Sequence, residues 1–231
     1  MKKKLLSFIV AICMVLPCLF VFSACGQKPS DPAIVCTVTE AEWEINFNIT
    51  KPKPQAQVVA DNSTTLPEIT SYTLRGEGAI SETVNGLGLL KVAPNAMYME
   101  FYVGDELAED IAGTYTNTNP IYIGLTTMLG SYFPFSGKYN DFTYDETKKA
   151  YVAENLISTV INEEDITDTY DVYNRRVEVT FINGYLNTIY LEICNEEEFN
   201  DNYHAILFTF SNINSTTVDT SSGDVDLRTE L

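Results

Sequence analysis

The stretch Val-Glu-Val-Thr-Phe-Ile-Asn-Gly-Tyr-Leu-Asn-Thr-Ile-Tyr-Leu-Glu-Ile-Cys, residues 177–194, decides the fold. From Val177 to Phe181, apolar and polar residues alternate, which is typical of a half-buried β-strand. Asn183-Gly184 follows, and this pair favours a type I′ turn because both central positions need a positive φ. Residues 185–194 then return with the same alternation. The stretch therefore predicts a β-hairpin in an antiparallel sheet.

Similar patterns of strands and turns occupy most of the chain after residue 68. Two apolar runs, 142–144 and 150–153, lie on either side of a polar loop and predict a second hairpin. Asn85-Gly86 predicts a tight turn between strands 79–84 and 87–92. Apolar residues at helical spacing over 125–133 predict a short helix. The remaining predicted strands are residues 69–74, 97–103, 114–118, 121–123 and 203–210.

The segment that follows residue 38 leaves two structures open. Thr39 and Glu42 have the spacing of a capping box, which favours the start of a helix, and Trp43 and Phe47 would then share one helical face. However, apolar residues also recur at every second position from Trp43 to Ile49, as they would in a strand. Periodicity alone does not decide between a helix and a strand here.

Length and composition indicate one folded, acidic domain. The chain has 231 residues, of which 45% are hydrophobic and 12% aromatic, and this content is too high for a disordered protein. It carries 32 acidic and 14 basic residues, so its formal net charge is -18. Because such a charge repels phosphate backbones, we expect no nucleic-acid partner.

The N-terminus has the pattern of a secretory signal. Three lysines at positions 2–4 precede an uncharged, mainly apolar stretch over residues 5–22. Ser23-Ala24-Cys25 then resembles the lipobox of bacterial lipoproteins, although Phe22 stands where Leu is usual. This resemblance implies cleavage after Ala24 and attachment of a diacylglyceryl group to Cys25, and two acyl chains hold a protein stably at a membrane. An uncleaved transmembrane helix and a plain secreted protein are the alternatives.

These features divide the chain into four parts. We expect a signal peptide over residues 1–24, a lipidated Cys25 with a tether over 25–38, a β domain over 39–218 and a flexible tail over 219–231. Two cysteines, Cys36 and Cys194, fall after the tether begins. They can form a disulfide outside the cell, or they can be buried thiols that pack as small hydrophobic groups.

Taken together, the hairpin motifs resemble a group of small lipoproteins common in Firmicutes. The fold of that group is similar to the lipoprotein-carrier half-barrels of the LolA and LppX type. The resemblance spans residues 39–218 and implies a mainly β fold of the α+β kind: a single curved antiparallel sheet, half-barrel-like, with one or two short helices and a lipid-lined concave face. It implies no catalytic residue. The matching residues are Phe142, Tyr144, Asp145, Glu146, Lys149, Tyr151, Val177, Val179, Phe181, Asn183, Gly184, Phe208, Phe210, Ser211 and Asn212.

Side chains with catalytic or metal-binding chemistry are scarce. His204 is the only histidine, so the usual zinc sites are unavailable, and no Gly-x-Ser-x-Gly elbow accompanies it. Carboxylates cluster over 105–110, 163–168 and 196–201, but none of these stretches has EF-hand spacing, and solvated acidic loops are favoured over calcium sites. We therefore expect a protein that is not an enzyme and that has no catalytic residue, no metal and no cofactor.

The composition and the two resemblances lead to one main functional expectation and one alternative. The main expectation is a membrane-anchored protein on the extracytoplasmic side that binds a lipophilic small molecule without covalent chemistry. The alternative is a cell-surface module that binds a protein or peptide, such as a cationic partner, through its acidic face or a sheet edge. The residues predicted to line the ligand groove are Met97, Met99, Phe101, Phe181, Ile189 and Leu191.

Overall fold

A computed structural model of the chain describes residues 35–48, 66–79, 85–94, 96–114, 133–161 and 169–218, all of which belong to the unit Ala33–Leu231. The predicted signal peptide, Cys25, the tail over 219–231 and the acidic stretch 163–168 lie outside the described residues. So do residues 115–132, which contain two of the predicted strands and nearly all of the predicted mid-chain helix.

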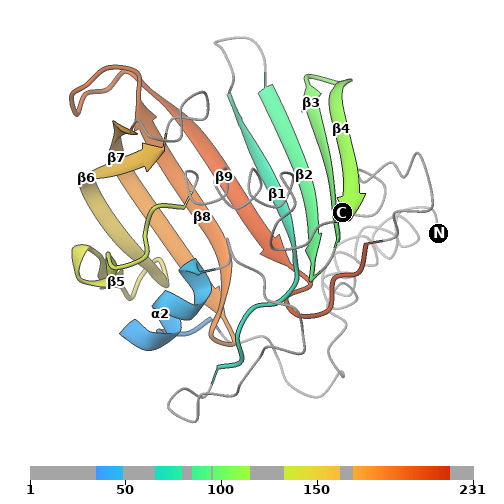
Figure 1. Cartoon of the computed structure of the whole chain (residues 1–231). Coiled ribbons are helices and arrows are strands. Elements are labelled where there is room, and N and C mark those ends of the chain that lie inside the picture. The colour runs from blue at the N-terminus through green and yellow to red at the C-terminus, as the bar shows by residue number, and fades with distance from the viewer. Residues whose placement is uncertain are drawn as a thin grey trace, which may run out of the picture. The chain divides into compact units, whose positions relative to one another are not determined.

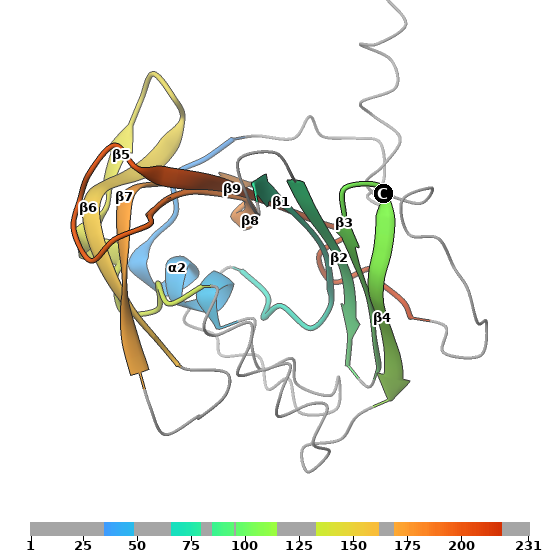
Figure 2. The ribbon, with the colours of Figure 1, turned by 90° about the horizontal axis from the view of Figure 1, so that it is seen from above.

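Within the described residues, nine antiparallel strands form one open sheet, in the order β4-β3-β2-β1-β9-β8-β7-β6-β5. Viewed along the strands, the sheet is arched, and the single described α-helix, α2, lies inside the arch (Figure 2). The expected mainly β fold with one curved antiparallel sheet is thus confirmed. The strands are β1 (Tyr72–Ala79), β2 (Asn85–Ala93), β3 (Ala96–Val103), β4 (Glu106–Thr114), β5 (Thr143–Asp145), β6 (Ala150–Ile161), β7 (Thr169–Ile182), β8 (Tyr185–Cys194) and β9 (Tyr203–Ser211).

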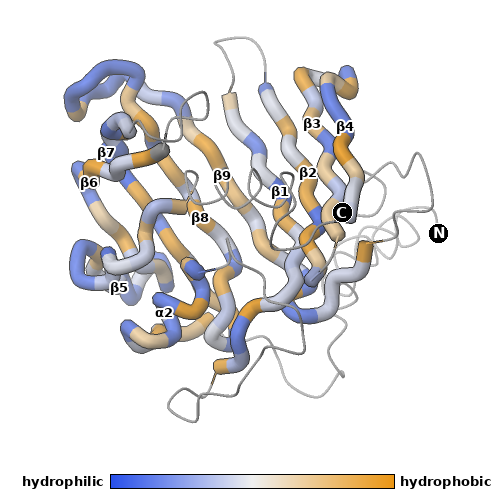
Figure 3. Tube along the Cα trace, in the orientation of Figure 1, coloured by the Kyte–Doolittle hydropathy of each residue, from blue (hydrophilic) through white to orange (hydrophobic). Residues whose placement is uncertain are grey.

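The hairpin predicted over residues 177–194 forms as β7 and β8 with the turn at Asn183-Gly184. Asn183 and Gly184 have φ values of 53° and 84°, which are the positive angles that a type I′ turn requires. Beyond the turn, Val179 is paired with Ile189 and Val177 with Leu191. The resulting alternation of apolar and polar residues is visible along β8 in Figure 3.

The second Asn-Gly pair does not form a turn, and that prediction is wrong. Asn85 and Gly86 belong to β2, where they are paired with Ala79 and Gly78 of β1, so the chain reverses between Ala79 and Asn85. The pair can remain extended because glycine accepts a strand conformation as well as a turn, and here the ladder with β1 determines its conformation.

The first acidic stretch is also not a loop. The chain turns at Gly104-Asp105, with Gly104 at φ 62°, and Glu106–Thr114 then pairs with β3 as strand β4. Its sequence lacks the alternation of a half-buried strand because seven of its nine residues are exposed, and the other two are half-buried. Because β4 lies at the edge of the sheet and is mostly exposed, its sequence lacks the alternating apolar residues that would predict a strand.

Helix α2 (Glu40–Phe47) settles the open question at the N-terminal side of the domain. The Thr39 side chain accepts a hydrogen bond from the Glu42 backbone N–H at 3.3 Å, and the Glu42 carboxylate accepts one from the Thr39 N–H at 2.8 Å. This capping box satisfies two backbone donors at the helix start, and Trp43 therefore lies on a helix rather than on a strand.

Trp43 is the centre of the main core, on the concave face of the sheet. Its ring is fully buried, and its centroid lies 4.7 Å from that of Phe47, 4.8 Å from Phe142 and 5.7 Å from Phe181. The indole N–H donates to the Phe135 carbonyl at 2.9 Å, so the polar end of the side chain is satisfied as well.

Asn46 fastens α2 to the β7–β8 turn. This fully buried side chain donates to the Glu42 and Gly184 carbonyls, both at 2.8 Å, and accepts a hydrogen bond from the Leu186 N–H at 2.6 Å. One amide group thereby joins the helix to the hairpin turn and to the start of β8. A buried amide that meets its partners in this way fixes the position of one element on another.

The two cysteines of the domain are free thiols at opposite ends of β8. The Cys36 sulfur accepts a hydrogen bond from the Gly184 N–H just before β8 begins, whereas Cys194 is its last residue. A strand of this length spans about 30 Å, at roughly 3.3 Å per residue, while disulfide-bonded residues lie within about 7 Å of each other. A disulfide between Cys36 and Cys194 is incompatible with this sheet.

Candidate functional site

The six residues of the predicted groove lie on the concave face, but in two different environments. Phe181, Ile189 and Leu191 are buried in the core that includes Trp43, and Met97 belongs to the same core. Met99 is half-buried and packs against it, whereas Phe101 is 36% exposed. The chain's own side chains therefore fill the face around the first four residues, and the face is open at Phe101.

Four glycines lie side by side next to Phe101. Gly76 and Gly78 of β1 are paired with Gly88 and Gly86 of β2, and Gly76 is also paired with the core residue Phe208 of β9. Residues that are directly opposite in a sheet, or two apart along a strand, share a face. All four glycines therefore face the concave side, where Gly86 is buried and the other three are half-buried, and we call this patch the glycine floor.

Packing explains some of these glycines but not all. A Cβ atom on Gly76 would lie 2.8 Å from the Phe208 ring, and one on Gly78 would lie 2.7 Å from the Ala205 carbonyl oxygen. At Gly88, the nearest described side-chain atom would be Cδ2 of Phe101, at 3.9 Å, an ordinary contact. Glycine inside a strand costs about 0.5–1 kcal/mol relative to alanine. Gly88 therefore weakens the strand without making room for any described neighbour.

The border of the glycine floor is first apolar and then acidic. Phe101 and Val103 of β3 are paired with Gly88 and Gly86, and the two side chains are 36% and 40% exposed. Beyond them, Glu109 is paired with Phe101, and Glu106 with Val103. An apolar chain laid along Gly88 and Phe101 would bury the exposed faces of Phe101 and Val103, which is favourable without any covalent step. Glycine in a strand commonly marks such a close approach.

The sequence analysis missed the glycine floor although its pattern is present in the sequence. Residues 76–78 and 86–88 both read Gly-x-Gly, and glycines two apart fall on one face of a strand. The predicted strands over 69–74 and 79–84 leave out Gly76 and Gly78, and Asn85-Gly86 is predicted as a turn. Once the register of β1 and β2 is known, the two Gly-x-Gly motifs coincide.

The outer face of β3 carries a buried carboxylate. Glu100 is 2% exposed, and its two oxygens accept hydrogen bonds from the Tyr98 and Tyr102 hydroxyls, each at 2.8 Å. Burial, followed by the hydrogen bond to Glu100, raises the pKa of Tyr98. The two tyrosines pack with Leu89 in a small second core, so they stabilise the sheet from outside rather than line a second ligand cavity.

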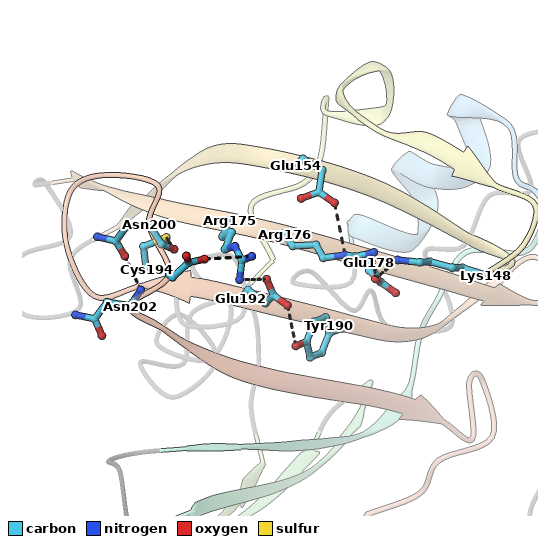
Figure 4. Close-up of polar contacts among 11 residues, drawn as sticks. Lys148, Glu154, Arg175, Arg176, Glu178, Tyr190, Glu192, Cys194, Asn200 and Asn202 are labelled. Carbon is cyan, nitrogen blue, oxygen red and sulfur yellow. Dashed lines mark hydrogen bonds and ion pairs between the residues drawn. The ribbon is translucent and has the colours of Figure 1, made fainter.

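A network of charged side chains covers the outer face of β6, β7 and β8 (Figure 4). Arg176 contacts Glu178 at 2.6 Å and Glu154 at 3.6 Å, and Lys148 contacts Glu178 at 3.0 Å. Close by, Arg175 lies 3.6 Å from Glu192 and 3.3 Å from Asp201, with its guanidinium over the Tyr203 ring.

A β-bulge explains how two successive arginines enter this network. The register shifts between Asn174 and Arg176, so Arg175 has no partner residue on β8 and can share the outer face with Arg176. The three cations of the network contact four carboxylates, so every positive charge is already balanced. Such exposed pairs contribute little to stability individually, and they offer no uncompensated charge to an anionic ligand.

His204 is the second residue of β9, next to the loop that joins β8 to β9. Its side-chain contact is with Asn195 and not with the arginines or glutamates of the charged network. Its Nδ1 lies 3.0 Å from the Asn195 side-chain oxygen, and burial lowers the pKa of the imidazole. No nucleophilic side chain is among the recorded hydrogen-bond partners of His204. This contact holds the imidazole ring beside the loop that connects β8 to β9.

Neither a metal centre nor a membrane-spanning helix is found in the part of the chain that the structure describes. Nowhere among the described residues do three or more His, Cys, Asp or Glu side chains meet in an arrangement that could hold a metal ion. The described helices are also too short or too polar to cross a bilayer.

Comparison with known proteins returns no relative. No protein-family model matches the chain, and neither the curated proteins nor the solved structures yield a match. The function must therefore be argued from the residues themselves.

Proposed function

We propose that this protein is an extracytoplasmic lipoprotein, anchored through a diacylglyceryl group on Cys25, whose β domain binds a lipophilic ligand without catalysing a reaction. The signal-like N-terminus and the lipobox resemblance support the anchor and the location. Gly88 of the glycine floor supports the ligand, because it is half-buried and lies beside the exposed Phe101 on a concave face whose centre is filled by core side chains.

Gly88 is the observation that carries the proposal. A Cβ atom at this position would lie no closer than 3.9 Å to any described atom, yet the residue is glycine. The exposed Phe101 ring lies directly beside the vacant position. A bound acyl or other apolar chain would use both features, since it needs a smooth floor and an apolar wall.

The charge of the protein narrows the ligand class. The net charge of -18 and the carboxylates of Glu106 and Glu109 at the border of the floor disfavour a ligand with an anionic head group. We therefore assign the ligand to neutral or cationic lipophiles.

Native mass spectrometry of gently purified protein tests this function. The wild-type protein is expected to carry a mass that organic solvent removes, whereas a diacylglyceryl group on Cys25 is covalent and remains. Gly88→Leu fills the floor and is expected to abolish the removable mass. Thr143→Leu adds the same side chain at an exposed position of β5 and is the matched control.

Two outcomes would contradict the proposal. If the wild-type protein carries no removable mass, even after incubation with a membrane lipid extract, the ligand hypothesis fails. If Gly88→Leu and the control retain the mass equally, the ligand binds elsewhere and the glycine floor is not its site.

A further inference from the structure

Strand β4 ends one edge of the sheet and has one described neighbour, β3 (Figure 1). From Ala96 to Phe101 the pairing of β3 with β4 is regular over six residue pairs, Ala96↔Thr114 to Phe101↔Glu109. A register shift occurs only after Phe101, near the hairpin turn. In a regular antiparallel edge strand, alternate backbone N–H and C=O groups point away from the sheet and can pair with another strand.

The charge along this edge is one-sided. Glu106, Glu109 and Asp110 are exposed and occupy the first half of β4, whereas the second half, Ile111–Thr114, is uncharged. The whole β3–β4 hairpin, residues 96–114, contains no Lys or Arg. The carboxylates also occupy both faces: Glu106 and Glu109 share the face of Phe101, and Asp110, paired with Glu100, lies on the opposite face.

We propose that β4 is the docking edge for an extended cationic segment of another protein, which adds to the sheet as a tenth strand. In an antiparallel arrangement, the C-terminal half of this segment lies beside Glu106, Glu109 and Asp110, and it carries Lys or Arg on both faces. Its N-terminal half lies beside Ile111–Gly113 and carries small or β-branched residues. Backbone hydrogen bonds supply affinity in this mode, and the side chains supply selectivity.

A second copy of this chain is a poor occupant of the same edge. Full-length antiparallel pairing of two β4 strands would place Asp110 opposite Asp110, with Glu109 of each copy nearby. Like charges that are directly opposite in a sheet destabilise the pair. The carboxylates of Glu106, Glu109 and Asp110 therefore disfavour pairing between two copies of β4. The same carboxylates favour the binding of a cationic partner at this strand.

The first test uses a synthetic nine-residue peptide whose four N-terminal residues alternate Thr and Val and whose C-terminal half carries lysines on both faces. Its binding to the full chain is followed by fluorescence anisotropy. Two further peptides are N-methylated at alternate residues, one at odd positions and one at even positions. Because alternate N–H groups point to opposite edges of a strand, one methylated peptide should lose binding and the other should keep it. Equal binding by both methylated peptides, or no binding by the parent, would overturn the proposal.

The second test asks whether the charge acts at β4 itself. The triple variant E106Q/E109Q/D110N is expected to weaken peptide binding about tenfold, because each exposed ion pair contributes a factor of roughly two to three. The variant E196Q/E197Q/E198Q removes the same charge from an exposed loop and should change the affinity less than about twofold. Circular dichroism confirms that each variant is folded. Equal weakening by both variants would show that only the overall negative charge matters and would refute docking at β4.

Discussion

Asn46→Ala should be among the most destabilising single substitutions in the domain. The Asn46 side chain is fully buried and makes hydrogen bonds to the Gly184 carbonyl, the Leu186 N–H and the Glu42 carbonyl. Alanine would leave the buried Leu186 N–H and the half-buried Gly184 carbonyl without this partner, and a buried group that loses its partner costs about 1–3 kcal/mol. We therefore expect a loss of about 3 kcal/mol, which is a large fraction of the roughly 5–15 kcal/mol that stabilises a typical domain.

Urea denaturation of the purified protein measures this loss. Trp43 is the only tryptophan and is fully buried three residues from Asn46, so its fluorescence reports on this core. With a slope of about 2 kcal/mol per M, a loss of 3 kcal/mol lowers the urea midpoint by about 1.5 M. Far-UV circular dichroism should give the same midpoint if the whole sheet unfolds together.

Two further variants make the result decisive. Asn48→Ala changes an exposed residue at the C-cap of the same helix and should shift the midpoint by less than about 0.3 M, in keeping with an effect within 0.5 kcal/mol. Asn46→Asp keeps the shape but buries a carboxyl group whose pKa is raised by burial, so its deficit should shrink as the pH falls and the group is protonated. If Asn46→Ala behaves like Asn48→Ala, the hydrogen bonds of Asn46 do not fasten the helix to the hairpin.

Three other substitutions give measurable shifts in the same assay. Gly184→Ala should lower the stability by about 2 kcal/mol, because φ is 84° and the new Cβ would lie 3.0 Å from Leu66. Gly137→Ala, at φ 73° with nothing within 4 Å of the new Cβ, should lower it by only about 1 kcal/mol. Equal losses of stability in the two variants would contradict a role for Leu66. Burial lowers the pKa of His204 below its usual 6.5, so the unfolded chain binds the proton more readily and stability falls as the pH drops through about 6.5. His204→Gln should remove this fall, and a difference from wild type that is constant between pH 8 and pH 5 would refute it. Gly88→Ala should raise stability by about 0.5–1 kcal/mol, since it removes a flexible residue and its Cβ atom meets no described atom closer than 3.9 Å, and a loss would show that the position is sterically filled.

The sequence predicted best where a local signal and the tertiary contacts agree. The turn at Asn183-Gly184 and the capping box at Thr39 each depend on residues within three or four positions, and both form as expected. The position of Trp43 was ambiguous because a short amphipathic helix and a strand can share one apolar pattern. The capping box gave the correct indication, and the recorded hydrogen bonds of Thr39 and Glu42 show why.

The sequence failed where a partner strand decides the structure. Strand β4 has few residues that favour strands and forms along the edge offered by β3. Asn85-Gly86 has the composition of a turn but lies in the ladder between β1 and β3. Likewise, the six predicted groove residues share the concave face, but alternation cannot say how far Trp43 and the other core side chains fill that face. Which part of a face stays open depends on contacts that are distant in sequence.

The glycines show how the open part of the face can be recognised once the register is known. Gly76 and Gly78 are required by their neighbours, because any side chain would collide with Phe208 or with the Ala205 carbonyl. Gly88 has no such neighbour among the described residues, so its retention lowers stability without improving the packing. A position that weakens the fold and that no described neighbour requires is one at which we infer a conflict between function and stability. Gly88 therefore supports a ligand more strongly than the exposed Phe101 beside it does, because single exposed apolar residues are common on protein surfaces.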